Sequence, residues 1–299
     1  MMALLEVTEL AKKFAEKTVV DTINFTLEEG TSTALIGPNG AGKTTTLSML
    51  TGLLTPTSGK IMMQGAKDGD IRAMIGFLPQ YPQFQSWLTA LEFTEMAAVL
   101  SGVAPKVAKM ESLKTLEFVG LNDVLHKKIA TFSGGMKQRL GIAQAIVHKP
   151  KLLLLDEPVS ALDPVGRREV MDLLKGLQQQ TTILYSTHIL NDAEEMTDKL
   201  LFLRHGQLVE QGTLAEVRKR YEEPNFVAEF ALETEALQFV SQSDLTAKAS
   251  GRFVYIAINE GQPGMHQVLD RLSKCPFQVL KVERQTASLE EIFMKVAKQ

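Results

Sequence analysis

Short apolar runs recur along the first 221 residues and predict buried strands. Residues 152–155 and 181–186 carry no charged side chain, which is typical of strands in a parallel sheet that is covered on both faces. From Ile23 to Leu27, apolar and polar residues alternate instead, which predicts a strand with one buried face. We therefore expect an α/β fold that combines a parallel-sheet core with an antiparallel β part.

Residues 81–130 have a different pattern. Strand signals vanish there, and helical spacing begins with Leu91, Thr94 and Ala98. We interpret this stretch as an inserted helical subdomain. It holds the only tryptophan, Trp87, whose simplest role is packing among these helices.

The pattern changes again after residue 221. Apolar residues alternate from Phe226 to Phe230, residues 264–274 have helical spacing, and Ser288 with Glu291 forms a capping box for a final helix. We expect a domain of residues 1–221, which includes the helical subdomain at about 81–130. A small α+β accessory domain of residues 222–299 follows, with the boundary at residues 222–225.

Composition limits the class of protein. The chain has 299 residues, 44% of them hydrophobic, and a net charge of -3, so nothing suggests nucleic acid as an obligate partner. Its single cysteine, Cys275, excludes a disulfide framework and favours a reducing compartment. No signal peptide is expected, because the N-terminus lacks a basic segment. No apolar run approaches the roughly 18 residues of a membrane span, so any spanning would be done by another polypeptide.

A glycine-rich loop joins an expected strand at residues 33–36 to an expected helix at residues 45–53. Its sequence is Gly37-Pro38-Asn39-Gly40-Ala41-Gly42-Lys43-Thr44. Glycines let successive backbone N–H groups approach an anion, and the helix N-terminus adds partial positive charge. Lysine supplies a full charge for phosphates, and the threonine hydroxyl is an oxygen ligand suited to Mg²⁺. We therefore predict a phosphate-binding loop.

Two later segments carry further candidate chemistry. Ser133 can cap a helix whose first residues, Gly134 and Gly135, expose N–H groups to an anion, although a simple turn has the same composition. Asp156 and Glu157 follow the leucine run at 152–155, where the carboxyl end of a strand places ligand-binding groups.

Three single residues complete the candidates. His188 follows the strand at 181–186 and is expected at the same edge of the sheet as Glu157. Asp163 precedes Pro164 and is a plausible helix N-cap. Phe14 either stacks on a base or packs in the core beneath a polar loop, and the sequence leaves both open.

Together these segments resemble the ATP-binding subunit of ABC transporters, over about residues 4–220. Gly37–Thr44 matches the Walker A motif, and Gln80 stands where the family has its Q-loop glutamine. Residues 133–138 match the signature motif, 152–157 Walker B with its catalytic glutamate, 160–163 the D-loop, and His188 the switch histidine. The order of all these motifs is highly specific. Phe132 replaces a usual leucine, and Phe14 a usual tyrosine. The tail at 287–293 looks like that of ABC-2 exporters.

The resemblance implies a P-loop NTPase of ABC type that binds ATP and Mg²⁺. It assigns the catalytic roles to Glu157, His188 and Gln80, and the metal to Thr44, Gln80 and Asp156. It assigns nucleotide binding to the following motif residues, with Thr44 in both roles: Phe14, Gly37, Pro38, Asn39, Gly40, Ala41, Gly42, Lys43, Thr44, Thr45, Ser133, Gly134, Gly135 and Asp163.

The resemblance also implies partners. These are a second ATP-binding subunit, in a homo- or heterodimer with composite sites, and a separate transmembrane permease. The chain would lie at the cytoplasmic face of the cell membrane, and no nucleic acid is expected. Export is the favoured direction. An importer subunit and a non-transport ABC ATPase remain alternatives.

Overall fold

The computed structural model describes residues 3–66, 70–160, 162–178, 180–221, 224–259, 261–285 and 289–298. Contacts divide the chain into two compact units, Met1–Leu214 and Ala215–Gln299. The sequence boundary after residue 221 stays a prediction, and Glu222 and Glu223, on which it rests, lie outside the described residues.

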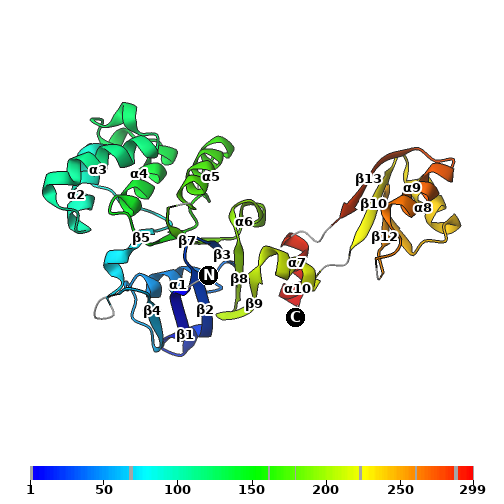
Figure 1. Cartoon of the computed structure of the whole chain (residues 1–299), viewed down its shortest axis with the longest axis horizontal. Coiled ribbons are helices and arrows are strands. Elements are labelled where there is room, and N and C mark those ends of the chain that lie inside the picture. Colours follow the sequence, from blue (N-terminus) through cyan, green and yellow to red (C-terminus); the bar gives the residue numbers. More distant parts are fainter. Residues whose placement is uncertain are drawn as a thin grey trace. The chain divides into compact units, whose positions relative to one another are not determined.

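A six-stranded sheet forms the centre of the first unit (Figure 1). Five neighbouring strands run parallel, and only the last strand is antiparallel to its neighbour. Strands β6 (Leu152–Asp156) and β7 (Thr182–Thr187), both in the interior of the sheet, are fully buried, as residues 152–155 and 182–186, which carry no charge, predict. The order is β5 (Ile75–Leu78), β6 (Leu152–Asp156), β7 (Thr182–Thr187), β3 (Ser32–Ile36), β8 (Lys199–Arg204) and β9 (Gln207–Thr213).

An antiparallel sheet is the second β part of this unit. Its order is β2 (Lys17–Glu28), β1 (Ala3–Phe14) and β4 (Ser58–Met63). Helix α1 (Lys43–Leu50) shares one hydrophobic core with both sheets, since a single cluster of buried side chains contains Leu47 of α1, Phe25 of β2 and Leu154 of β6. The expected combination of parallel and antiparallel parts is confirmed.

Phe14 ends β1 in a hairpin with β2, where it pairs with Lys17. The polar loop expected at this position is therefore wrong. Its side chain is 47% exposed, so the core alternative is also wrong. Lys12 Nζ lies over the Phe14 ring, 5.0 Å from its centroid.

Residues 81–130 contain helices and 3₁₀ turns but no named strand, as expected. Trp87 lies in a turn before α2 and is 69% exposed. The expectation that it packs among helices is wrong, because it precedes the helix instead of lying on its buried face. The helices of this unit are α2 (Ala90–Leu100), α3 (Pro105–Phe118), α4 (Gly134–Ile146), α5 (Pro164–Gln178) and α6 (Leu190–Met196), with 3₁₀ turns at Arg72–Met74, Asn122–Val124 and Ile129–Thr131.

The second unit contains a four-stranded antiparallel sheet in the order β11-β12-β10-β13. Alternating residues of β10 and β12 pack against helices α8 and α9 in a separate core. The chain order β-α-β-β-α-β with this strand order is a ferredoxin-like arrangement. Ser288 of the expected capping box lies outside the described residues. The elements are α7 (Leu214–Tyr221), β10 (Asn225–Phe230), α8 (Glu233–Gln242), β11 (Ala247–Ser250), β12 (Phe253–Ala257), α9 (Met265–Lys274), β13 (Val279–Gln285) and α10 (Leu289–Lys298).

None of the helices among the described residues is long and apolar enough to cross a membrane.

Replacing Leu154 on β6 with alanine should lower the free energy of unfolding of the first unit by about 2–5 kcal/mol, because a fully buried side chain leaves a cavity. Denaturant unfolding followed by circular dichroism measures this. Leu53→Ala is the matched control, since Leu53 is 72% exposed and should lose less than about 0.5 kcal/mol. Equal losses would contradict the buried, interior position of β6.

Candidate functional site

The glycine-rich loop connects the end of β3 to the start of α1. The helix begins at Lys43, two residues before the sequence prediction, because Gly42 serves as its N-cap. Gly40 and Gly42 have φ values of 80° and 109°, which L side chains rarely adopt. A Cβ on Gly42 would also lie 2.8 Å from the Val19 carbonyl oxygen. The loop therefore requires glycine at this position for two independent reasons.

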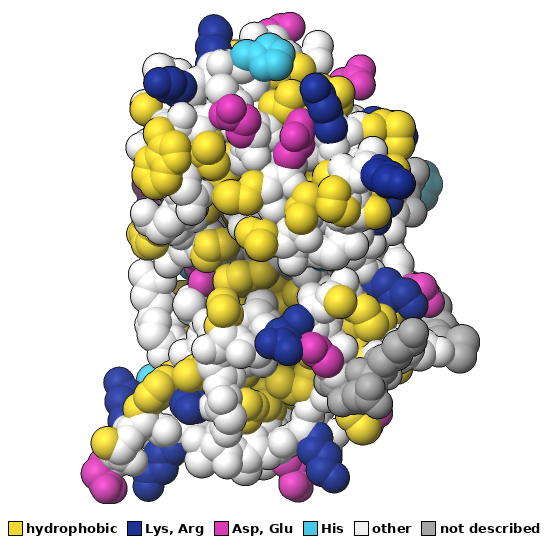
Figure 2. Space-filling model, turned by 90° about the vertical axis from the view of Figure 1, so that its left-hand side faces the viewer, with side chains coloured by type: hydrophobic (Ala, Val, Ile, Leu, Met, Phe, Trp, Pro, Cys, Tyr) yellow, Lys and Arg dark blue, Asp and Glu magenta, His cyan; other side chains and the backbone are white. Residues whose placement is uncertain are grey.

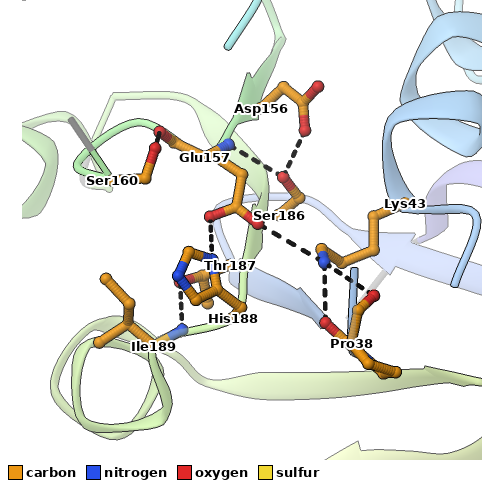
Figure 3. A network of polar contacts seen from close by, with 10 residues as sticks. Pro38, Lys43, Asp156, Glu157, Ser160, Ser186, Thr187, His188 and Ile189 are labelled. Atoms are coloured by element: carbon orange, nitrogen blue, oxygen red, sulfur yellow. Dashed lines mark hydrogen bonds and ion pairs between the residues drawn. The ribbon is translucent and has the colours of Figure 1, made fainter. Parts of the chain in front are cut away.

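Lys43 is almost completely buried among acceptors (Figure 3). Its Nζ donates to the carbonyl oxygens of Gly37, at 2.7 Å, and Pro38, at 3.4 Å. Glu157 Oε1 lies 3.5 Å from the same atom. The loop thus bends the lysine back over its own carbonyl groups and toward the carboxyl end of β6.

Glu157 joins Lys43 to His188. Its Oε2 lies 2.7 Å from His188 Nδ1, and only 6% of Glu157 is exposed, against 47% for the histidine side chain. The expectation that His188 and Glu157 meet at one edge of the sheet is confirmed. Glu157 itself has a φ of 51°, which turns the chain sharply out of the strand.

Lys43 and Glu157 line a cleft of about 370 Å³, whereas His188 is not among its lining residues. The glycine-rich loop and the start of α1 supply one wall, and Val19 of β2 and the residues that follow β5 and β6 supply the others. An anion here would meet the N-terminus of α1 and the lysine ammonium group. The lining residues are Val19, Asn39, Gly40, Gly42, Lys43, Thr44, Thr45, Gln80 and Glu157.

Other predicted site residues do not line this cleft. Ser133 caps α4 by accepting a hydrogen bond from the Met136 N–H at 3.2 Å, and Gly134 opens the helix with free space around its Cα. Asp163 caps α5 in the same way, accepting from the Gly166 N–H at 3.2 Å. Both predicted caps are therefore confirmed. Gly135 and Phe14 are likewise outside the cleft, and Ala161 of the matched D-loop is outside the described residues.

The donor set fits a magnesium ion that is shared with phosphates. Among the described residues, no three His, Cys, Asp or Glu side chains gather as a metal site. Mg²⁺ on a nucleotide needs only one or two protein oxygens. Thr44 and Gln80 offer such oxygens in the cleft, and Asp156 adds a buried carboxylate beside Glu157.

Ion pairs connect α5 to α6, the helices that follow the D-loop match and the switch histidine. Arg167 holds Asp192, which is almost fully buried, through both its Nε and its terminal nitrogen. Arg168 and Lys175 both bind Glu195. Hydrogen bonds, first from Lys175 and then from Arg168, hold the pKa of Glu195 below its usual value. These contacts join α5 to α6 at three positions of α5.

Two side chains at the site are ones to which sequence reasoning gave no role. Ser186 on β7 bonds to Asp156 and to the Glu157 backbone. Gln138 on α4 donates from Nε2 to the Pro158 carbonyl oxygen at 2.6 Å. Gln138 belongs to the matched signature motif and Ser186 to the expected strand at 181–186, but their contacts depend on strand register and helix packing, so no local pattern could have identified them.

Comparisons with known proteins agree with this geometry. The sequence profile described as "ABC transporter" matches residues 20–160. A second profile, for the C-terminal domain of DrrA1-3-like ATP-binding proteins, matches residues 212–297. YxlF of Bacillus subtilis (strain 168), described as an uncharacterized ABC transporter ATP-binding protein, is 42% identical over 98% of this chain and 99% of its own length. The chain belongs to the ATP-binding subunits of ABC transporters.

Other members of this ABC family are also similar along their whole length. The bacitracin transport ATP-binding protein BcrA of Bacillus licheniformis is 34% identical over 99% of this chain and 98% of its own. A solved ATP-binding subunit of an ABC transporter is 32% identical and superposes with a TM-score of 0.66 over 73% of this chain and 93% of its own. A dimeric ATP-binding cassette bound to ADP and Pi is 28% identical, with a TM-score of 0.63 over 70% of this chain and 98% of its own. The expected ABC fold, ATP binding and ATPase class therefore hold for this chain.

Replacing Gly42 with alanine should weaken ATP binding at least about 10-fold, because the added Cβ forces the loop away from its positive φ and from the Val19 carbonyl group. Fluorescent-nucleotide titration measures the affinity. Gly251→Ala is the control, since Gly251 also has a positive φ, of 57°, but lies in the second unit with open space around it. Normal ATP affinity in the Gly42 variant would contradict a loop that must approach the phosphates closely.

Proposed function

We propose that this chain hydrolyses MgATP at composite sites of a head-to-tail dimer and thereby drives a separate membrane permease, as part of an exporter. The main supporting observation is that Glu157, which lines a cleft at the N-terminus of α1, contacts both Lys43 and His188. ATP binding alone would not need a carboxylate and an imidazole in mutual contact at the position of the terminal phosphate.

In this proposal the residues in and beside the cleft have different roles. Lys43 exchanges its carbonyl partners for the β- and γ-phosphates, and Thr44, Gln80 and Asp156 hold Mg²⁺. The ion neutralises charge on the phosphates. Glu157 orients and polarises the attacking water, and His188 keeps the carboxylate in place and contacts the γ-phosphate. Catalysis is then positioning and charge stabilisation, as in other phosphoryl transfers.

The absence of the signature-motif residues from the lining of the cleft supports a dimer. Ser133 and Gly135 are at the exposed start of α4, and neither lines the cleft of its own chain. A second subunit would bring its own Ser133 to the γ-phosphate, and Asp163 would report across the interface. The similar cassette bound to ADP and Pi is itself described as dimeric.

A membrane permease is the proposed partner that ATP hydrolysis drives. The permease would dock on the helical part of the first unit, close to Gln80. Figure 2 looks onto the side with α2 and α3, where hydrophobic side chains are spread over the face. Exposed hydrophobic residues in this stretch include Tyr81, Trp87 and Leu100. The chain would thus be held at the cytoplasmic face of the cell membrane by its partner.

Export is the proposed direction. The linearmycin resistance protein LnrL of Bacillus subtilis (strain 168) is 36% identical over 73% of this chain and 71% of its own length. Resistance to an antibiotic and bacitracin transport, the function in the name of BcrA, both suit removal of a compound from the cell. The match of residues 212–297 to the DrrA1-3-like domain extends this similarity to the second unit.

Glu157→Gln should lower kcat for ATP hydrolysis at least about 100-fold, because an amide cannot polarise the attacking water. ATP affinity should stay within about threefold, since the amide still fills the site. Phosphate release in steady state and nucleotide titration measure the two quantities. The exposed Glu169 on α5 provides the control, Glu169→Gln. Normal turnover in the Glu157 variant would contradict the assignment of Glu157 as the group that polarises water.

Tagged Glu157→Gln chain, purified from its own cells in mild detergent with ATP and Mg²⁺, should carry a multi-span membrane protein, because slow hydrolysis holds the closed complex together. Mass spectrometry identifies the partner, and the control is the Gly42→Ala chain, which should bind ATP at least about 10-fold more weakly. A solute-binding protein in the eluate would favour import instead. Ribosomal or DNA-repair proteins without any membrane protein would contradict the transporter assignment.

A further inference from the structure

One buried hydroxyl touches both acidic residues of the site. Ser186 lies on β7 directly opposite Asp156 of β6 in the parallel register. Its Oγ donates to Asp156 Oδ1 at 2.6 Å and accepts the Glu157 N–H at 2.9 Å. The serine is completely buried, so water cannot replace either bond. Figure 3 shows the hydroxyl between the two residues.

The bond to the Glu157 N–H supports an unfavourable backbone. Glu157 has a φ of 51°, in the left-handed region that residues other than glycine, asparagine and aspartate seldom occupy. Such a conformation persists only where its surroundings hold it. The Ser186 hydroxyl stabilises this backbone conformation through the Glu157 N–H. The conformation in turn directs the carboxylate of Glu157 toward Lys43 and His188.

The hydrogen bond from Ser186 to Asp156 fixes the orientation of the Asp156 carboxylate. Oδ1 receives the short bond from Ser186, and Oδ2 has no hydrogen-bond partner among the residues that the structure describes. A hydroxyl bond to an ionised carboxylate is a strong one. The serine therefore stops rotation of the carboxylate and leaves one oxygen available to a metal ion or its water shell.

We propose that Ser186 is a positioning residue for ATP hydrolysis, which sets the orientation of Asp156 toward magnesium and of Glu157 toward the attacking water through one hydroxyl group. This rests on the proposed function. Ser186 touches no reacting atom itself. Its loss should leave ATP able to bind and leave the two carboxylates poorly aligned.

A purely structural serine would behave differently. Ser32 on β3 of the same sheet is also fully buried, and its hydroxyl has no partner among the described residues. Ser32→Ala therefore removes the same atom from the same sheet without removing a contact to a carboxylate. It should fold and hydrolyse ATP as the unchanged chain does.

The test compares full-length Ser186→Ala, Ser186→Cys, Ser186→Thr and Ser32→Ala with the unchanged chain. We expect Ser186→Ala to lower kcat about 10- to 50-fold with KM for ATP within about threefold, and to raise the Mg²⁺ concentration for half-maximal rate several-fold. Ser186→Cys keeps the volume but replaces the hydroxyl with a weak donor, so it should be slow and yet stable to heat. Ser186→Thr restores the hydroxyl and should recover most of the rate.

Calorimetric ATP titration with and without Mg²⁺ gives a readout that needs no turnover. The Mg²⁺ gain is the ratio of the Kd for ATP without Mg²⁺ to the Kd with Mg²⁺. This ratio should be at least threefold smaller in Ser186→Ala and unchanged in Ser32→Ala. Turnover within twofold of the unchanged chain at every Mg²⁺ concentration, together with an unchanged Mg²⁺ gain, would overturn the role of Ser186, while a slow Glu157→Gln would still support the proposed function. An unchanged chain that fails to hydrolyse ATP would overturn that function, and the Mg²⁺ gain would still decide the role of Ser186.

Discussion

The register of three adjacent parallel strands is the constraint on which the site depends. β6, β7 and β3 end side by side, so that Asp156 faces Ser186 and Ile36 faces Thr187. A shift of one residue would turn each side chain to the opposite face of the sheet. Contact between a lysine after β3, a glutamate after β6 and a histidine after β7 is thus a consequence of how the sheet pairs.

Burial gives these polar contacts their strength and their direction. Lys43 and Glu157 are each 6% exposed, so their charges are screened less than charges at the surface. Each charge keeps partners in the protein, which is what burial of an ion requires. An incoming phosphate would therefore replace hydrogen-bond partners that Lys43 already has, and would not need to dehydrate a solvated ammonium group. The loop can keep the same fold before and after the nucleotide binds.

Sequence reasoning found the elements whose signals are local. The glycine-rich loop, the caps Ser133 and Asp163, and the buried run of β6 all depend on residues close together in the chain. It failed where distant packing decides, as for the exposed Trp87 and for Phe14 at the tip of a long hairpin. Ser186 shows the same limit, because nothing in residues 181–186 reveals which strand lies next to them. The roles of the site residues in hydrolysis stay predictions.

The positive φ of Glu157 has a meaning for how this chain balances folding against activity. Glycine or asparagine would occupy that backbone conformation with less strain, yet a long, charged side chain stands there, almost buried. Stability alone would favour a different residue. The position therefore marks a place where the fold gives up some stability for reactivity, and variants selected only for heat resistance would tend to lose the glutamate first.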